Sequence, residues 1–155
     1  MKFHSVAIFV KAIERSKDFY MRLLDQKIEH DFGTNIIFEG GLSIWEVSKD
    51  HIISKKLSSK NSTNNFELYF VNDSLDEIFA RLKKENVEFV HEIQEEPWGQ
   101  RNFRFFDPDK HLIEIAEPLH VFVNNMHNKG LSIEEISEKS GIQIKTVTEI
   151  INQKN

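Results

Sequence analysis

A pattern of one β-strand, one helix and three short β-strands occurs twice in this chain, and this repetition constrains the fold most strongly. In the first copy, residues 3–10 show the alternation of a strand, and residues 14–24 place apolar side chains on one helical face. Three strand-like runs follow at 27–32, 35–39 and 42–47, separated by glycine-containing turns. This order predicts a βαβββ module.

The same order restarts after a polar segment rich in Ser, Asn and Lys, which predicts a linker at 49–63. The elements expected in the second copy are strands at 66–71, 87–93, 101–106 and 111–116, and a helix through Leu75, Ile78, Phe79 and Leu82. One alignment of the two copies places Leu42 on Leu112. We therefore predict an α+β fold in which two βαβββ modules, 1–48 and 64–117, form a curved sheet around a cleft, with a small helical extension at 118–155.

The composition excludes several classes of site. The chain has 155 residues and no cysteine, which suits one domain with an appendage and excludes disulfides, thiolate zinc sites and cysteine nucleophiles. A net charge of −5 argues against nonspecific binding to phosphate backbones. No run approaches the ~20 apolar residues of a membrane span, and no signal-peptide pattern is present. We therefore expect a cytoplasmic protein without a membrane partner.

Two motifs resemble one known superfamily. Residues 10–20, Val-Lys-Ala-Ile-Glu-Arg-Ser-Lys-Asp-Phe-Tyr, followed by Leu23-Leu24, are similar to the first helix of the glyoxalase / bleomycin-resistance / dioxygenase superfamily, which has the vicinal oxygen chelate (VOC) fold. The Pro-Trp-Gly-Gln-Arg run at 97–101 and the strands at 103–109 and 112–117 resemble its closing hairpin. The resemblance covers about residues 1–117. It implies that the two modules enclose one site and that the chain forms a homodimer, with the cleft completed in cis or by swapping.

Metal-using members of that superfamily place their ligands on the inner faces of four strands. The resemblance puts these positions at Ser5, Ile44, Phe66 and Glu114, with Glu67 on the opposite face of its strand. Only Glu114 is a ligand-type residue, and one carboxylate does not hold a divalent ion. We therefore predict a cleft with neither metal nor cofactor. The alternative is a register shift that brings His4 and Glu46 inward to join Glu114.

The cleft is expected to be mostly apolar. The residues predicted to contact the ligand are Ser5, Ile44, Trp45, Phe66, Phe70, Trp98 and Arg101, with Ala7 and Leu68 also facing inward. Trp98 either closes over a flat ligand or anchors a core or an interface. Arg101 either holds a ligand carboxylate or pairs with Glu114, and the internal pair is favoured. Glu114 is the candidate catalytic residue, as an acid or base.

The segment 118–155 shows three amphipathic stripes, with a capping box at Ser132–Glu135 and a run at 130–147 that resembles a helix-turn-helix core. Its four lysines are matched by four glutamates, and it has no arginine. Because Lys and Arg supply most nonspecific affinity for phosphates, nucleic-acid binding is not expected. The favoured interpretation is a packing module that covers the cleft or the dimer seam.

The leading functional hypothesis is a metal-free protein that binds a small apolar or aromatic molecule, for sequestration or resistance. A second hypothesis is a lyase, isomerase or dioxygenase with a nonstandard metal site, or with Glu114 as acid or base. A third is a ligand-responsive regulator that uses the helical tail. The sequence leaves open whether any reaction is catalysed and what the ligand is.

Overall fold

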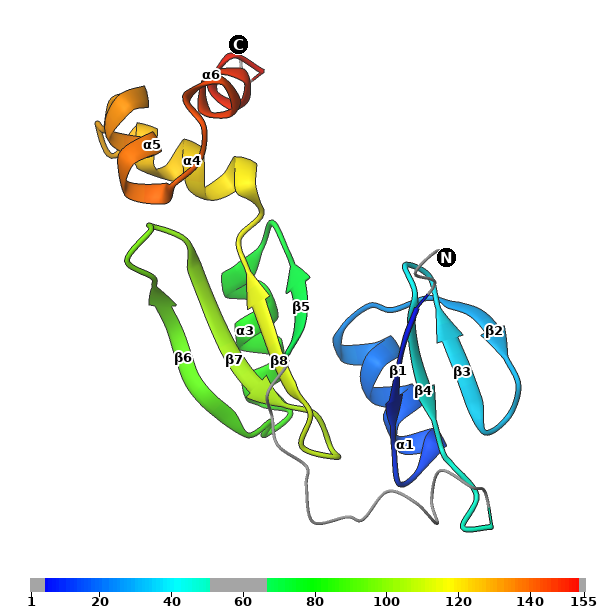
Figure 1. The fold of residues 1–155 in the computed structure, drawn as a ribbon. Coiled ribbons are helices and arrows are strands. Elements are labelled where there is room, and N and C mark those ends of the chain that lie inside the picture. Colours follow the sequence, from blue (N-terminus) through cyan, green and yellow to red (C-terminus); the bar gives the residue numbers. More distant parts are fainter. Residues whose placement is uncertain (1–4, 51–66, 154–155) are drawn as a thin grey trace. The chain divides into compact units, whose positions relative to one another are not determined.

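The computed structural model describes residues 5–50 and 67–153, and these residues form two four-stranded sheets with helices (Figure 1). Backbone contacts divide the chain into two compact units. The first contains the first module and residues 107–111, and the second contains the rest of the second module and the C-terminal helices. The predicted α+β fold with two βαβββ modules and a helical extension is confirmed.

The first module has its strands in the order β1-β4-β3-β2, with β1 parallel to β4 and the other pairs antiparallel. Its elements are β1 (Val6–Phe9), α1 (Ile13–Asp18), the π-helical turn η1 (Phe19–Leu23), β2 (Ile28–Asp31), β3 (Asn35–Phe38) and β4 (Leu42–Trp45). Ile8, Ile36 and Ile44 lie side by side across three strands and are almost entirely buried. They form the core face of this sheet.

The buried centre of the first unit includes a polar group. Tyr20 is fully buried, and its hydroxyl donates to Asp107 Oδ2 over 3.0 Å. Burial and the Asp107 charge raise the pKa of Tyr20 well above its usual value. Burial opposes ionisation of Asp107, but hydrogen bonds from His111 and from backbone amides outweigh it and lower the pKa of Asp107. The 107–111 turn is therefore held by the hydrogen bonds that Asp107 accepts.

The second module repeats the topology, with the strand order β5-β8-β7-β6. Its elements are β5 (Leu68–Val71), α3 (Leu75–Lys84), β6 (Phe89–Glu95), β7 (Arg101–Phe106) and β8 (Leu112–Ala116). Phe79 of α3 packs on Phe89 and Phe103, with ring centroids 5.1 and 5.2 Å apart. One face of this sheet is therefore covered by α3 and forms the core of the module.

The opposite face of the second sheet carries polar side chains. Tyr69 and Arg104 lie beside Glu114 in the register of β5, β7 and β8, and Asn102 lies two residues before Arg104. Side chains alternate between the faces of a strand, so these residues point away from the α3 side. We call this surface, defined by Tyr69, Asn102, Arg104 and Glu114, the polar face.

The C-terminal helices α4 (Leu119–Asn128), α5 (Ile133–Ser140) and α6 (Ile144–Asn152) form a small bundle. Its buried core consists of Phe122, Val123, Met126, Ile136 and Val147. The predicted capping box is confirmed, because Ser132 Oγ accepts from the Glu135 amide while Glu135 Oε2 accepts from the Ser132 amide. No helix among the described residues is long and apolar enough to span a membrane.

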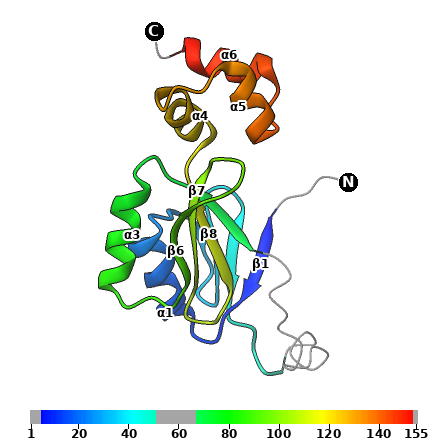
Figure 2. The same ribbon diagram turned by 90° about the vertical axis from the view of Figure 1, so that its left-hand side faces the viewer.

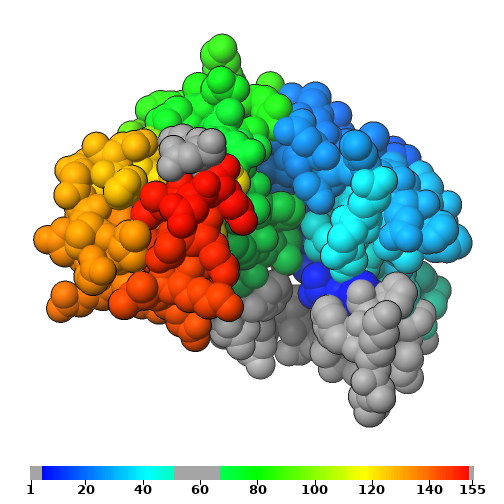
Figure 3. Space-filling view, turned by 90° about the horizontal axis from the view of Figure 1, so that it is seen from above, coloured from blue at the N-terminus to red at the C-terminus, as the bar shows by residue number. Residues whose placement is uncertain are grey.

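The helical bundle packs against the β6–β7 hairpin of its own unit (Figures 2 and 3). Glu95 accepts hydrogen bonds from Lys129 Nζ at 3.0 Å and Lys139 Nζ at 3.1 Å, and these bonds lower its pKa. A Cβ atom placed on Gly99 would lie 2.6 Å from Met126 Sδ, so the hairpin loop approaches α4 as closely as a glycine allows. Two tail lysines are thus bound to the second module.

This contact predicts that Gly99→Ala destabilises the protein more than an alanine at a comparable open turn. Gly99 and Gly33 both have positive φ, +96° and +76°, but no atom lies within 4 Å of a Cβ on Gly33. Gly33→Ala carries only backbone strain of about 1–2 kcal/mol, whereas Gly99→Ala adds an overpacking cost of about 1 kcal/mol or more. Urea denaturation of both variants measures the difference in unfolding free energy, and equal losses would contradict the close packing.

Candidate functional site

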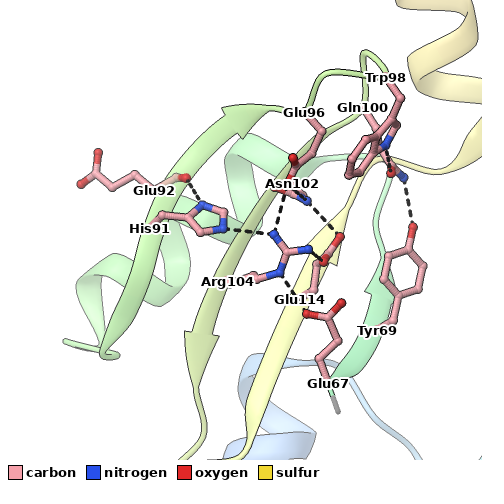
Figure 4. A network of polar contacts seen from close by, with 10 residues as sticks. All are labelled: Glu67, Tyr69, His91, Glu92, Glu96, Trp98, Gln100, Asn102, Arg104 and Glu114. Atoms are coloured by element: carbon pink, nitrogen blue, oxygen red, sulfur yellow. Dashed lines mark hydrogen bonds and ion pairs between the residues drawn. The ribbon is translucent and has the colours of Figure 1, made fainter. Parts of the chain in front are cut away.

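Arg104 binds three carboxylates on the polar face (Figure 4). Its Nε donates to Glu67 Oε2 over 2.9 Å, its Nη1 donates to Glu96 Oε1 over 3.1 Å, and its Nη2 forms an ion pair with Glu114. Glu67 precedes β5, Glu114 lies in β8 and Glu96 follows β6. Side chains from three parts of the module therefore converge on one guanidinium, and we call these four residues the Arg104 cluster.

Asn102 joins two of these carboxylates. It is fully buried, and its Nδ2 donates to Glu96 Oε1 and to Glu114 Oε1, both over 3.0 Å. Its Oδ1 is also buried and has no hydrogen-bond partner among the described residues. A buried acceptor without a hydrogen-bond partner costs free energy. A hydrogen-bond donor or a cation bound next to this oxygen would remove that cost.

His91 completes the surroundings of Arg104. Its Nδ1 lies 2.8 Å from the Glu92 carbonyl oxygen, which can only accept a hydrogen bond. With the proton on Nδ1, Nε2 accepts from Arg104 Nη1 over 3.3 Å. The guanidinium is thus held by acceptors on several sides.

The carboxylates of the cluster have pKa values that are shifted in opposite directions. Burial raises the pKa of Glu114; the Asn102 hydrogen bond and the Arg104 charge oppose this shift, and the Glu67 charge adds to it. The hydrogen bond from Asn102 lowers the pKa of Glu96 despite burial, with Arg104 adding to the effect. Burial opposes the charge on Arg104, but its bonds to Glu67 and Glu96 raise its pKa. Three carboxylates share one permanently charged cation.

Two aromatic side chains lie beside the cluster. Trp98 Nε1 donates to Gln100 Oε1 over 3.1 Å, and Gln100 Nε2 donates to the Tyr69 hydroxyl over 3.0 Å (Figure 4). Gln100 is buried and also donates to the Glu117 carbonyl oxygen over 2.7 Å. Tyr69 is 53 % exposed and Trp98 is 39 % exposed. Their polar ends are fixed while their rings remain accessible, and we call these two residues the aromatic pair.

Glu114 and Trp98 lie near each other on the second module. Glu114 is part of the polar face but is only 3 % exposed, whereas Trp98 is part of the aromatic pair and is 39 % exposed. In the first unit, Ser5 and Trp45 are half-buried. Trp45 shares its face of the sheet with Phe9, and their rings meet edge to face at 5.9 Å. The predicted contacts of these residues with a ligand stay predictions.

The placement of Ile44 and Phe70 on the inner faces is wrong. Ile44 is fully buried on the core face of the first sheet. Phe70 pairs with Ile115, which places it, like Leu68, on the α3 side rather than beside Glu114. The expected contact of Phe66 lies outside the described residues.

The error at Ile44 came from a one-residue register difference between the two modules. Val6 pairs with Leu42 in the first module and Leu68 pairs with Ile113 in the second, so Leu42 corresponds to Ile113 rather than to Leu112. A shift of one residue moves every side chain to the other face. The counterpart of Glu114 is therefore Ser43, whose hydroxyl donates to the Val6 carbonyl over 3.2 Å.

The observed register also places Glu67 and Arg104 beside Glu114, which the sequence did not predict. Glu67 was expected on the wrong face, yet it binds Arg104 beside Glu114. The predicted pair of Arg101 with Glu114 is also wrong, because Arg101 binds Asp76 at 2.7 Å and Glu117 at 3.3 Å. The partner of Glu114 is Arg104, three residues along β7, which register with β8 would have indicated.

The donor set of the cluster does not fit a resident divalent ion. Glu67, Glu96 and Glu114 already bind the guanidinium of Arg104, which supplies the positive charge. Across residues 5–50 and 67–153, no group of three or more His, Cys, Asp or Glu side chains has a metal-binding arrangement. The register shift that would bring Glu46 inward does not occur, because Glu46 Oε2 accepts from the Ile13 amide over 2.7 Å.

The duplicated topology and the comparisons define the class of the protein. The family model of the glyoxalase-like domain matches residues 3–120. A protein of unknown function from Agrobacterium tumefaciens C58 is 38 % identical, with a TM-score of 0.69 over 77 % of this chain and 95 % of that one. The chain belongs to the glyoxalase-like family.

More distant structures share the fold. A glyoxalase / bleomycin resistance protein / dioxygenase from Nocardioides is 19 % identical, with a TM-score of 0.59 over 76 % of this chain and 83 % of that one. A fosfomycin resistance protein from Listeria monocytogenes is 18 % identical, with a TM-score of 0.56 over 76 % and 93 %. No curated protein matches the chain.

The raised pKa of Glu114 predicts a pH-dependent cost. The folded protein keeps this proton to a higher pH than the unfolded chain, in which the pKa is near 4.5. The resulting stabilisation is complete below that value and is lost as pH rises through the folded-state pKa. Glutamine cannot ionise, so the unfolding free energy of the wild type minus that of Glu114→Gln should fall as the pH rises from acidic to neutral.

Urea denaturation over a pH series measures this difference. Glu138→Gln, at an exposed position of α5, is the control and should show a smaller pH trend. A difference for Glu114→Gln that increases with pH would mean that the Arg104 pairing outweighs burial.

Proposed function

We propose that this protein binds a small flat aromatic molecule that carries a positive charge, on the polar face of its second sheet and without a metal ion. The observation that carries the proposal is the exposed aromatic pair beside a cluster in which carboxylates outnumber the guanidinium. Sequestration of such a molecule, as in a resistance protein, is the role we assign to this binding.

The aromatic pair supports a flat ligand. Trp98 and Tyr69 are tied to Gln100 through their polar ends, so little side-chain freedom remains to be lost on binding. Stacking on such a ring adds about 0.5–1.5 kcal/mol beyond the burial of apolar area. A planar ring system therefore gains from a surface that is already ordered.

The charge of the cluster supports a cationic ligand. Glu67 and Glu96 keep partly exposed side chains, at 33 % and 14 %, whereas Glu114 is buried behind them. A ligand cation close to Glu67 and Glu96 would meet the unneutralised charge, and a cation also binds favourably over an aromatic face. An anionic ligand would be repelled by the same carboxylates.

The family membership supports small-molecule binding in general. The fosfomycin resistance protein with this fold shows that the fold occurs in a resistance protein, although 18 % identity extends the likeness only to the fold. A homodimer, implied by the superfamily resemblance, and a cytoplasmic location, expected from the sequence pattern, remain part of this proposal. The tail supports a packing role rather than nucleic-acid binding, because Lys129 and Lys139 are engaged with Glu95.

A catalytic role for Glu114 is the second candidate. Its raised pKa suits a general acid or base, since proton transfer is most efficient when the pKa lies near the working pH. If Glu114 is catalytic, Glu114→Gln abolishes turnover of a bound compound while binding persists. If the protein only sequesters its ligand, product analysis detects no conversion of the bound compound by the wild type or by Glu114→Gln.

Calorimetric titration with proflavine and acridine tests the proposed ligand class. Both are flat three-ring molecules, but at neutral pH proflavine is a cation and acridine is largely uncharged. We expect saturable binding of proflavine, with affinity about tenfold or more above that of acridine. Trp98→Ala should weaken proflavine binding by about two- to tenfold, the stacking contribution.

Phe32→Ala is the matched control, because Phe32 is a 66 % exposed aromatic residue on the first module. It should leave the affinity unchanged. Equal affinity for the two compounds, or equal losses in Trp98→Ala and Phe32→Ala, would contradict the proposal.

A further inference from the structure

We propose that the helical bundle α4–α6 positions the aromatic pair, so that docking of the bundle on the β6–β7 hairpin sets the affinity of the polar face for its ligand. This inference rests on the proposed function for the ligand and adds a means of regulating its binding. Docking and binding are then thermodynamically linked, and each stabilises the other.

The hairpin loop at 96–100 is the segment that the bundle and the aromatic pair share. It is a tight loop, because the Glu96 amide donates to the Gln100 carbonyl oxygen and the Gly99 amide donates to the Glu96 carbonyl oxygen, both over 2.8 Å. Trp98 lies at its tip, and Gln100 accepts from the Trp98 indole (Figure 4). A displacement of the loop therefore moves the Trp98 ring.

Helix α4 supports this loop by direct packing. Met126 is 2 % exposed and belongs to the buried core of the bundle. Its Sδ atom would lie 2.6 Å from a Cβ on Gly99, which leaves no space between the loop and the helix. The residue next to Trp98 therefore rests on the core of the bundle.

Glu117 connects α4 to the aromatic pair by hydrogen bonds. Its side chain is buried, and its Oε1 accepts from Asn125 Nδ2 of α4 over 3.2 Å. Its carbonyl oxygen accepts from Gln100 Nε2 over 2.7 Å, and Gln100 fixes the polar ends of both aromatic side chains. A continuous series of contacts thus runs from α4 to the aromatic pair.

Glu95 connects the base of the loop to two helices of the bundle. It is the last residue of β6, and its carboxylate accepts from Lys129 Nζ and from Lys139 Nζ. The lysine side chains are 58 % and 38 % exposed, so they can be changed without altering the bundle core or the aromatic pair. These ion pairs are therefore the place at which docking can be tested.

Reversal of both lysine charges, Lys129→Glu with Lys139→Glu, replaces two attractions to Glu95 by two repulsions. Adding Glu95→Lys restores the attraction with the charges exchanged. In a Trp45→Phe background Trp98 is the only tryptophan, so acrylamide quenching of fluorescence reports its accessibility. We expect the quenching constant to rise by about half or more on charge reversal, and to return to its starting value with Glu95→Lys.

Lys145→Glu is the matched control, because Lys145 lies on the same bundle, is 84 % exposed and is 3.9 Å from Glu149. It should leave the quenching of Trp98 unchanged. Equal quenching with and without charge reversal would overturn the inference, and so would an increase that Glu95→Lys does not reverse. If charge reversal lowers the helix content, Lys129→Gln with Lys139→Gln removes the attraction without repulsion and should change the quenching in the same direction.

Calorimetric titration of the full chain with proflavine tests the consequence for binding. Charge reversal should weaken the affinity by about two- to tenfold, up to the loss caused by Trp98→Ala, and should cause no further loss in a Trp98→Ala background. The reversal adds negative charge, whose field alone would strengthen the binding of a cation. A loss of affinity therefore reports the position of the Trp98 ring.

The two measurements separate the inference from the proposed function. If the wild type does not bind proflavine, the proposed ligand class fails, and the quenching of Trp98 still decides whether the bundle positions the aromatic pair. If the wild type binds proflavine and charge reversal leaves the affinity unchanged, the ligand class stands and the inference is overturned.

Discussion

The ion pair between Arg104 and Glu114 is the interaction on which the polar face depends. Glu114 is only 3 % exposed, and a buried carboxylate without partners is strongly disfavoured. Removing one member of a buried pair typically costs about 3–5 kcal/mol, because the remaining charge is left without compensation. The pair holds β7 and β8 side chains in register and brings Glu67 and Glu96 to the same guanidinium. The need to pair the buried Glu114 with a cation therefore also determines which charged groups meet at the candidate site.

The fold could be predicted because the same order of strands and helix occurs twice along the sequence. The strand–helix–three-strand order and the motifs around the first helix and closing hairpin required no knowledge of exact register. The site did depend on register. Ile44 and Phe70 were placed one residue out of phase, and Glu67 was assigned to the wrong face for the same reason. Short strands of four residues with apolar side chains on both faces contain no alternation strong enough to fix the phase.

The sequence also could not show which carboxylates bind Arg101 and which bind Arg104. Arg101 and Arg104 both lie on β7, and both face carboxylates, so spacing alone does not distinguish them. Arg101 and Arg104 are three residues apart, so their side chains lie on opposite faces of the sheet. Arg104 lies directly opposite Glu114. Arg101 lies at the start of the strand and binds Asp76 and Glu117. Glu96 and Trp98 reach the site from the hairpin loop, whose glycine packs against Met126. The tail thus supports the loop that presents these residues, a role that charge composition alone could not show.

A crystal structure of the full chain grown with Mn²⁺, with anomalous diffraction data, tests the central claim most directly. Our account predicts no anomalous peak among Glu67, Glu96 and Glu114, with the guanidinium of Arg104 within hydrogen-bond distance of all of them. An anomalous peak coordinated by these carboxylates, with Arg104 displaced from the cluster, would contradict it.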